Sequence, residues 1–314
     1  MSNHVKVAIK IRPLLRKEIF NGETICCKAI KNSDHVCFAN KKLFSFDYVF
    51  DEFCSQGSGK TYTMGTWYQR ELIEPERGIL PRAINYIFDR IEQSKNVEYE
   101  LSVSSIEIYK EEIRDLLDPL NLSKDLNIRE DEFGNNVITR LTERKVNSRE
   151  DVLDFLEDGV NQRVTRTTKM NETSSRSHCI FTVIMSQKNQ KEKKNLLKSK
   201  FHFVDLAGSE RVRKTGNVGE RFRESIHINN GLLALGNVIS SLSGPKGKNG
   251  HVPYRQSKIT RILKDSLGGN AYTLMICCIS PAWTNLDESF NAVTYASRAR
   301  NIKNSPVNNI QNID

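Results

Sequence analysis

The hydrophobic positions of this chain follow two spacings, and the first of them predicts strands. Residues Val5–Ile11 alternate apolar and polar side chains and stop at Arg12-Pro13, which indicates a strand that ends in a proline turn. The same reasoning, from alternation or from short apolar runs, predicts strands over Leu43–Phe50, Glu98–Tyr109, Ser177–Ser186, Lys200–Leu206 and Thr273–Ile279.

The second spacing, with apolar residues three and four positions apart, predicts helices. Ile84, Ile87, Phe88 and Ile91 have this spacing, and Pro81 lies near the start of the segment, which indicates an amphipathic helix over Ile79–Ile91. Other helices are expected after a Ser148 cap and over Arg221–Leu242, Ser257–Leu267 and Leu286–Ala299.

Interleaved strands and helices predict an α/β fold with three layers, in which helices flank a central mixed sheet. No repeat, low-complexity tract or linker divides the chain. The lysine-rich stretch Lys188–Lys198 is interpreted as a solvated loop between two strands, with a functional basic patch as the alternative. The only tail is Lys303–Asp314.

Composition narrows the class of protein. Hydrophobic residues make up 38% of the 314 residues, enough for a core, and no apolar run approaches the roughly 18–20 residues that span a bilayer. The N-terminus has no signal-peptide pattern, and the seven cysteines fit neither a disulfide framework nor a zinc site. The net charge of +9 indicates an acidic partner without identifying it.

The first chemical motif is Gly57-Ser58-Gly59-Lys60-Thr61, the second half of the phosphate-binding pattern G-x-x-x-x-G-K-[ST]. Glycines let backbone N–H groups approach phosphate oxygens, the lysine neutralises phosphate charge, and the threonine hydroxyl can ligate Mg²⁺. The first glycine of the pattern is replaced by Cys54. Because Gly-Ser-Gly turns are also common in loops, this motif alone leaves nucleotide binding open.

Two further motifs follow in order. Residues 171–178 read NETSSRSH, which is either a polar turn capped by Asn171 or a cluster of hydroxyl groups and an arginine for a phosphate. Residues 205–210 read DLAGSE and begin where an apolar strand is expected to end. An acidic residue at that position holds nucleotide-bound Mg²⁺ in many nucleotide hydrolases, and Gly208 lets a backbone N–H approach a γ-phosphate.

The three motifs together resemble the P-loop, switch I and switch II of a kinesin motor domain. Other segments agree with the family: KIRP at 10–13, HVPYR with SKITR at 251–261, GLLALGNVI at 231–239 and ARNIKN at 299–304. The resemblance covers Val5 to about Val307 and is greatest to the chromokinesin-type branch. It implies a motor domain over residues 1–302 and the start of a neck linker over 303–314.

The resemblance implies a role for each matching residue. Nucleotide binding would involve Lys10, Arg12, Pro13, Gly57, Ser58, Gly59, Lys60, Thr61 and Tyr62, with Tyr62 stacked on adenine. Thr61 and Ser175 would ligate Mg²⁺, and Asp205 would hold it through water. Asn171 and Ser174 would place the attacking water, Gly208 would sense the γ-phosphate, and Arg176 would pair with Glu210.

The expected partner is the acidic surface of the microtubule. By resemblance, Arg255, Lys258 and Arg261 face tubulin, with Lys214 and Arg144 as weaker candidates. The family also implies ATP and Mg²⁺ as cofactors, a cytoplasmic and cytoskeletal location that includes the spindle, and a dimer formed through a coiled coil beyond Asp314. A nucleic-acid-binding P-loop protein would use the positive charge too, but no stacking surface or recognition helix is evident.

One departure from the family lies directly before the P-loop. Asp51–Gln56 leads straight into Gly57, where the family has a helix and a buried strand; roughly thirty residues, about one strand-crossover unit, are missing. Either Leu43–Phe53 moves into the vacant strand position or the sheet has a gap. The sequence is then either that of a splice variant or of an incompletely assigned gene of an active motor, or that of a divergent paralogue that has lost ATPase activity.

These observations leave two functional hypotheses. The first is a microtubule-stimulated ATPase that couples hydrolysis to movement, with plus-end direction implied by the resemblance alone. The second is an ATPase-impaired module that binds microtubules through the intact residues at 251–261.

Overall fold

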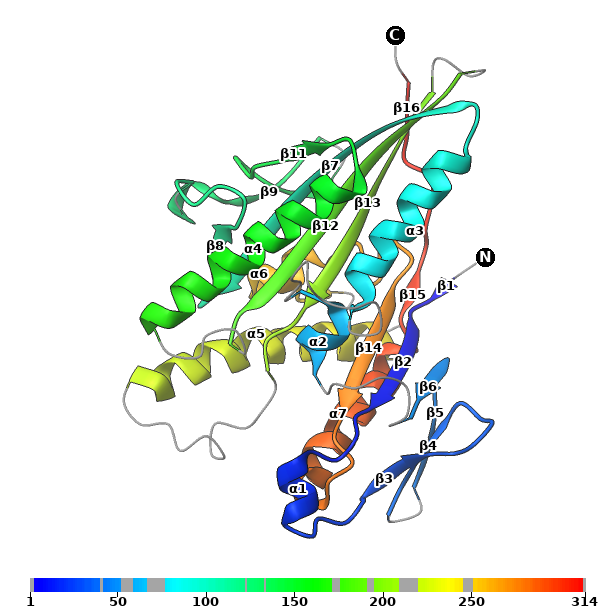
Figure 1. Ribbon diagram of the computed structural model, residues 1–314, viewed down its shortest axis with the longest axis vertical. Coiled ribbons are helices and arrows are strands. Elements are labelled where there is room, and N and C mark those ends of the chain that lie inside the picture. The colour runs from blue at the N-terminus through cyan, green and yellow to red at the C-terminus, as the bar shows by residue number, and fades with distance from the viewer. Residues whose placement is uncertain are drawn as a thin grey trace. The chain divides into compact units, whose positions relative to one another are not determined.

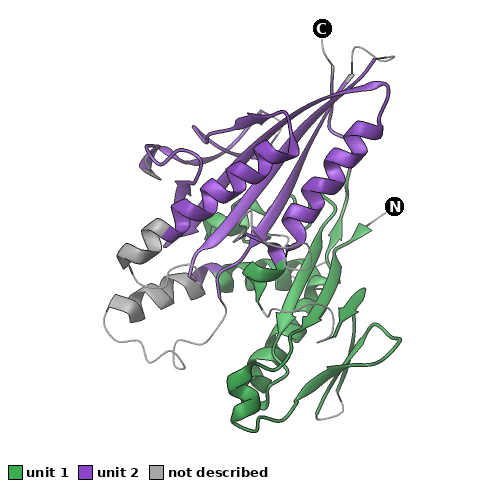
Figure 2. Cartoon of the chain, viewed as in Figure 1, with its two compact units in different colours: residues 1–63, 232–306 green, residues 64–231, 307–314 purple. Residues whose placement is uncertain are grey.

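The computed structural model describes residues 3–39, 42–51, 59–66, 77–121, 123–132, 134–170, 176–190, 195–208, 220–244 and 251–312. The chain divides into two compact units, coloured separately in Figure 2. Unit 1 comprises residues 1–63 and 232–306, and unit 2 comprises residues 64–231 and 307–314. In the part of the chain that is described, no helix has both the length and the apolar character needed to cross a membrane.

A small parallel sheet forms the centre of unit 1. Its order is β14 (Leu274–Ile279), β2 (Lys6–Ile11) and β6 (Tyr48–Phe50), with β2 in the middle (Figure 1). The register pairs Ala8 with both Ile276 and Tyr48. The apolar residues of β2 are buried, as expected for a strand that is covered on both faces.

Helices and a second sheet complete unit 1. The helical segments are α1 (Arg16–Phe20), the first residues of α2 (Lys60–Met64), the second half of α5 (Glu220–Ser243), η5 (Tyr254–Gln256), α6 (Lys258–Ile262), η6 (Trp283–Asn285) and α7 (Leu286–Ala299). The antiparallel strands β3 (Cys27–Ala29), β4 (His35–Phe38) and β5 (Leu43–Ser45) form the second sheet. Phe38, Phe44 and Phe290 hold α7 to it through edge-to-face ring contacts of 5.5–5.9 Å.

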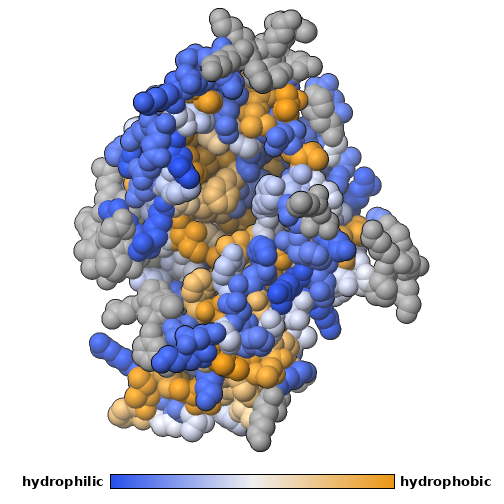
Figure 3. Space-filling view, turned by 90° about the vertical axis from the view of Figure 1, so that its right-hand side faces the viewer, coloured by the Kyte–Doolittle hydropathy of each residue, from blue (hydrophilic) through white to orange (hydrophobic). Residues whose placement is uncertain are grey.

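The small sheet and its neighbours leave apolar surface uncovered. Figure 3 shows hydrophobic residues gathered at the lower end of unit 1. Among the exposed large apolar side chains of this unit are Ile19, Phe20 and Ile25.

Unit 2 is built on long antiparallel strands. The sheet order is β11 (Arg144–Val146), β7 (Val97–Tyr109), β12 (His178–Asn189), β13 (Asn195–Asp205) and β16 (Ile310–Asn312), with β8 (Glu112–Asp115) also paired to β7. A short helix η2 (Ser123–Asp125) and the hairpin of β9 (Ile128–Glu130) and β10 (Asn136–Ile138) extend from β8.

Two helices cover one face of this sheet, as Figure 1 shows for α3 (Ile79–Gln93) and α4 (Arg149–Met170). The core between the helices and the sheet contains Leu80, Ile84, Phe88, Val152, Leu156, Leu101, Val103, Phe181, Val183 and Phe203. Ser148 caps α4 as the sequence predicts, because its Oγ accepts a hydrogen bond of 3.1 Å from the Asp151 amide.

Most of the predicted elements are confirmed, but the prediction that Lys188–Lys198 forms a loop is wrong. Strand β12 continues to Asn189 and β13 begins at Asn195, with Lys188 opposite Leu196. Most of Lys188–Lys198 therefore extends the sheet as two strands rather than forming a loop. The backbone hydrogen bonds between β12 and β13 continue to the pair Lys188 and Leu196, beyond the apolar part of β12. Parts of the expected tail are also strands: β15 (Lys303–Asn304) pairs with β1 (Asn3–His4), and β16 pairs with β13.

The predicted α/β class is confirmed, with both kinds of strand pairing present. In the described ranges these pairings form separate sheets, the parallel one in unit 1 and the larger antiparallel one in unit 2. Strand β6 stays on the side of β2 opposite β14. The described part of the segment, Leu43–Phe50, therefore does not pair with β14, so the prediction that it takes the place of the missing strand gains no support from these residues.

Candidate functional site

Residues predicted to surround a nucleotide base meet at the end of β2 and the start of α2. The Lys10 ammonium is buried, donates a 3.1 Å hydrogen bond to Thr63 Oγ1 and lies 5.8 Å from the centroid of the Tyr62 ring. This cation–π contact and hydrogen bond fix the lysine beside the aromatic ring. Lys60, Thr61 and Tyr62 occupy the first turn of α2 and are half-buried.

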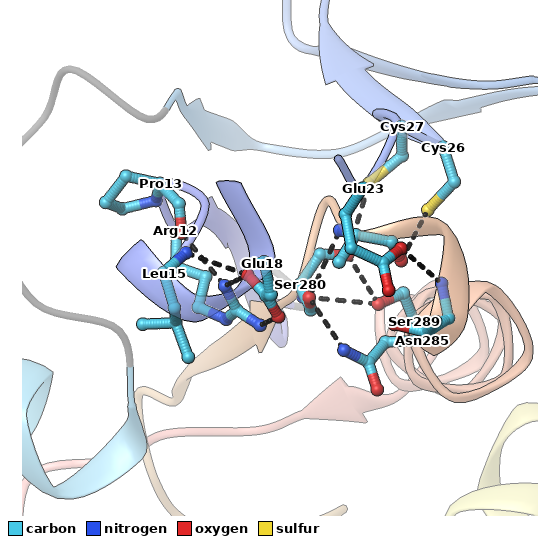
Figure 4. Close-up of polar contacts among 12 residues, drawn as sticks. Arg12, Pro13, Leu15, Glu18, Glu23, Cys26, Cys27, Ser280, Asn285 and Ser289 are labelled. Atoms are coloured by element: carbon cyan, nitrogen blue, oxygen red, sulfur yellow. Dashed lines mark hydrogen bonds and ion pairs between the residues drawn. The ribbon is translucent and has the colours of Figure 1, made fainter. Parts of the chain in front are cut away.

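Arg12 is held by its own loop, as Figure 4 shows. Its guanidinium makes a two-pronged contact with Glu18, at 2.6 Å from Nη1 and 2.5 Å from Nη2, and Nη1 also donates to the Pro13 carbonyl. The Leu15 amide donates to the same carboxylate at 2.8 Å. The hydrogen bonds from Arg12 lower the pKa of Glu18. Arg12 therefore orders the turn after β2, and Glu18 is a residue that the motif search missed.

A second cluster shown in Figure 4 joins the loop before β3 to the end of β14. The Cys26 thiol donates to the Ala282 carbonyl at 3.4 Å, and Ser289 Oγ donates to the Ser280 carbonyl at 2.7 Å. Within β14 itself, burial raises the pKa of the Cys277 thiol to about 12. Buried thiols of this kind stay protonated and unreactive.

Unit 2 contains a buried ionic cluster around Asp205. Arg163 of α4 lies 3.7 Å from Glu107 Oε1 on β7 and 3.8 Å from Asp205 Oδ2 at the end of β13. Ser177 bridges within the cluster, because it donates to Glu107 at 2.6 Å and accepts from Arg163 at 3.3 Å. All four side chains are at most 7% exposed.

Thr66 completes the surroundings of Asp205. Its Oγ1 donates to Asp205 Oδ2 at 2.8 Å, whereas Asp205 Oδ1 is buried with no hydrogen-bond partner among the residues that are described. Of this cluster the sequence predicted only Asp205. The available signal was the unusual position of Glu107, a charge inside the apolar strand Leu101–Tyr109.

The second and third motifs are brought together by a histidine. His178, the last residue of NETSSRSH, accepts a 3.1 Å hydrogen bond at Nδ1 from the Ala207 amide of DLAGSE. Gly208 follows directly and is half-buried, as is Arg176. The sites Gly57, Ser58, Asn171, Ser174, Ser175, Glu210 and Lys214 lie outside the described residues.

Three of the predicted microtubule-facing residues lie on one short segment of unit 1. Arg255 is exposed in η5, and Lys258 and Arg261 are half-buried in α6. Ser257 caps α6 by accepting from the Thr260 amide, and the Tyr254 hydroxyl donates to the Leu267 carbonyl at 2.5 Å. Arg144 lies in unit 2 on β11 and donates to the Leu117 carbonyl at 3.3 Å, so the sequence had grouped residues from two units.

Comparison with known families settles the family. A family model described as the kinesin motor domain matches residues 53–302, well over half of the chain. The chain belongs to the kinesin motor family. It is similar to the mouse kinesin-like protein KIF27, with 48% identity over 344 aligned positions that cover 98% of this chain and 25% of the relative.

Other kinesin relatives and a solved structure agree. Human chromosome-associated kinesin KIF4A is 45% identical, with 98% of this chain and 27% of the relative covered, which agrees with the chromokinesin-type resemblance. A solved fast kinesin, described with its ATPase mechanism and interactions with microtubules, superposes with a TM-score of 0.88 at 36% identity. That match covers 98% of this chain and 94% of the other. The chain spans about a quarter of the length of these curated relatives.

The described surroundings of Asp205 fit a bound Mg²⁺, which this family is expected to use together with a nucleotide. The unpartnered oxygen of Asp205 is a buried acceptor that a metal-bound water could satisfy. No group of three or more His, Cys, Asp or Glu side chains placed to hold a metal occurs within the described ranges. A site in which hydroxyls, water and phosphate oxygens supply most ligands does not need such a group.

The buried cluster gives a first prediction. Replacing Arg163 with Met leaves Asp205 buried without its cation and leaves Glu107 with Arg114 alone, so we expect the free energy of unfolding to fall by about 3–5 kcal/mol. The matched control is Arg149→Met, which breaks the more exposed contacts with Asp89 and Glu92 and is expected to cost about 0–1 kcal/mol. Urea unfolding of both variants, made in a chain with the segment before the P-loop restored, checks this. Equal losses would mean that the cluster adds nothing.

Proposed function

We propose that this chain is the motor domain of an ATP-hydrolysing motor that uses Mg-ATP, is stimulated by microtubules and moves toward the plus end, with an activity that the missing segment limits. The observation that carries the proposal is the kinesin motor match over residues 53–302. The described residues support it, because the groups expected around the base and around Asp205 have partners that fix their positions.

Base binding would rest on the residues at the end of β2. Tyr62 would stack on adenine with Pro13 and Arg12 beside it, and Lys10 would hold the ring in place through its contact with Tyr62. The hydrogen bonds that Arg12 donates to Glu18 would keep this edge ordered before the nucleotide arrives. Such preorganisation removes an ordering cost from binding.

Hydrolysis of a phosphoanhydride passes through a loose transition state, so positioning and charge stabilisation supply most of the rate. Lys60 would neutralise phosphate charge, with backbone amides of Gly57, Ser58 and Gly59 around it. Asn171 and Ser174 would orient the attacking water, and the Gly208 amide would donate to the γ-phosphate. When bound, Mg²⁺ supplies charge neutralisation, and Thr61, Ser175 and Asp205 would hold it.

Closure of the site would depend on the two switch segments. Arg176 would pair with Glu210 after ATP binds, and the His178 bond to Ala207 would carry the motion of one segment to the other. Segments that order around the γ-phosphate and relax on its release form a two-state element. The residues after Ile302, partly paired as β15 and β16, would respond as the neck linker.

A second candidate is an ATPase-impaired module that binds microtubules. Two observations favour it. Among the described residues β14 pairs with β2 alone, and the alignment with KIF27 runs over 344 positions, 30 more than the 314 residues of the chain. At least those 30 positions have no residue of this chain opposite them. The family match also begins at residue 53, beside the proposed deletion between 54 and 57.

The microtubule partner is tested by charge removal. Replacing Arg255, Lys258 and Arg261 with Ala should weaken binding about tenfold at low salt and flatten its salt dependence, because exposed ion pairs are screened. Co-sedimentation with microtubules across a salt series measures both effects. The matched control removes three exposed charges of the same unit, Arg16, Lys17 and Lys28, and should change little. If both triple variants bind alike, the surface is misassigned.

Direction and assembly are separate proposals. Plus-end movement would be read from gliding of polarity-marked microtubules over the longer protein, in which a coiled coil would join two motor domains. Movement toward the minus end would contradict the proposed direction without touching the ATPase assignment. Association with cytoplasmic and spindle microtubules is expected for the same longer protein. We expect neither a membrane span nor direct contact of this domain with nucleic acid.

A further inference from the structure

The two carboxylate oxygens of Asp205 have different surroundings. Oδ2 accepts the 2.8 Å hydrogen bond from Thr66 Oγ1 and lies 3.8 Å from Arg163 Nη1. Oδ1 is buried and has no hydrogen-bond partner among the residues that the structure describes. The torsion that turns a carboxylate has only broad preferences of its own, so the contacts of Oδ2 decide where Oδ1 points.

The direction of this carboxylate is set by Thr66 rather than by Arg163. The Thr66 contact has the length of a hydrogen bond, whereas the 3.8 Å from Arg163 Nη1 to Oδ2 exceeds hydrogen-bond range. Arg163 also lies 3.7 Å from Glu107 and donates to Ser177 at 3.3 Å, so its charge is shared between two carboxylates. Arg163 therefore supplies charge to the cluster, and Thr66 supplies the directional contact with Asp205.

The turn after α2 fixes the position of Thr66. Gly65, directly before it, has a φ of +80°, a left-handed conformation that a side chain would strain. A Cβ on Gly78, the residue before α3, would lie 2.3 Å from the Gly65 nitrogen, so the two backbones are in close contact. Thr66 itself is 3% exposed, and its branched side chain has few rotamers. The hydroxyl is therefore held toward Asp205 before any ligand binds.

We infer that Thr66 is a positioning residue for the metal of the proposed active site. By holding Oδ2, its hydroxyl keeps Oδ1 of Asp205 available to a water of the bound Mg²⁺, and it strengthens Mg²⁺ binding without touching the metal. Hydrogen-bond partners of metal-site groups typically contribute about 10–100-fold in metal affinity. The phosphate-loop pattern ends before Thr66, so no motif identifies this residue. The inference deepens the proposed function and rests on it.

The test uses the chain with the KIF27 segment restored, because nucleotide binding needs a folded phosphate loop. Thr66 and Asp205 belong to unit 2 and the insertion point belongs to unit 1, so the insertion changes no residue of the unit that contains the contact. Affinity for a fluorescent ADP analogue is measured in excess Mg²⁺ and in EDTA. Thr66→Val removes the donor and keeps a similar shape, so it should weaken binding about tenfold in Mg²⁺ and leave it unchanged in EDTA. Thr66→Ser keeps the hydroxyl and should bind nearly as the parent does.

Three further variants make the result specific. Thr66→Ala also lacks the hydroxyl, and it carries the same expectation if urea unfolding shows that the valine variant does not fold. Thr182→Val removes another buried hydroxyl of unit 2, which hydrogen-bonds His202 at 2.9 Å, and should leave both affinities unchanged. In an Asp205→Ala background, Thr66→Val should have no further effect, because the oxygen that Thr66 holds is absent.

The outcomes that contradict the inference are distinct. Equal losses of affinity in Mg²⁺ and in EDTA would show a merely structural role for Thr66 and overturn it. An unchanged Mg²⁺ response in Thr66→Val, a serine variant as weak as the valine variant, or an undiminished effect in the Asp205→Ala background would overturn it as well. A parent chain whose nucleotide affinity does not respond to Mg²⁺ would overturn the proposed function together with the inference.

Discussion

Inserting the missing KIF27 segment between Cys54 and Gly57 is expected to raise microtubule-stimulated ATPase activity at least about a hundredfold. The phosphate loop works by preorganised N–H groups, which need a rigid strand behind them. In this chain β6 ends at Phe50 on the side of β2 opposite β14, and β14 has no second strand partner in the part of the chain that is described. A displacement of about 1 Å in such a site costs about a hundredfold in rate.

The same insertion should raise stability. Each backbone group left unpaired in a buried sheet costs about 1–3 kcal/mol. Within the described ranges β2 is the one strand paired with β14, so the inserted strand would add its hydrogen bonds along the other edge of β14. Against a total stability of about 5–15 kcal/mol, these losses are large enough to leave the 314-residue chain poorly folded. The control is a Gly/Ser insert of equal length, which should restore neither property. Equal rescue by this insert would mean that spacing alone matters.

Replacing Arg176 with Ala should abolish hydrolysis while ATP affinity stays nearly unchanged. Arg176 is half-buried beside the buried Ser177 and would pair with Glu210 only after ATP binds. Loss of one preorganised group that acts in the transition state typically costs about 10²–10³ in turnover. The measurement is single-turnover hydrolysis together with nucleotide binding, made in the chain with the segment restored, because it needs an active background.

Two further variants make this result interpretable. Glu210→Ala should give the same phenotype, since removing either member breaks the pair. Arg149→Ala removes an arginine that bonds Glu92 on the surface of unit 2 and should leave turnover unchanged. Loss of ATP affinity and turnover in equal measure for Arg176→Ala would point to misfolding and contradict the assigned role.

The sequence predicted elements well where one face of the element is apolar. The helix over Leu286–Ala299 is α7 with the same bounds, and the predicted strand Glu98–Tyr109 is β7 with one residue added. In α7 the apolar residues recur at the helical spacing, and in β7 they recur at the strand spacing, so each pattern determines its own structure. The lysine-rich hairpin was missed because its last pairs are held by the backbone ladder, which the side-chain pattern does not report.

The candidate site was predicted only in part. Linear motifs identify Lys10, Tyr62 and Asp205, because their spacing along the chain reflects their chemistry. Arg163 and Glu107 have no such motif, since residues 56 positions apart meet only once α4 packs against β7. The tertiary fold alone brings these charges to Asp205. Glu18 is a similar case, because only the turn after Pro13 returns it to Arg12.

The central claim is that this chain is a kinesin motor domain whose ATPase activity is limited by the missing segment. Steady-state ATPase rates, with and without microtubules, for the 314-residue chain and for the chain with the KIF27 segment inserted test it most directly. We predict little activity and little stimulation for the first, and clear stimulation by microtubules for the second. Comparable rates for the two would contradict the claim, because the phosphate loop would then be fully supported without the missing strand.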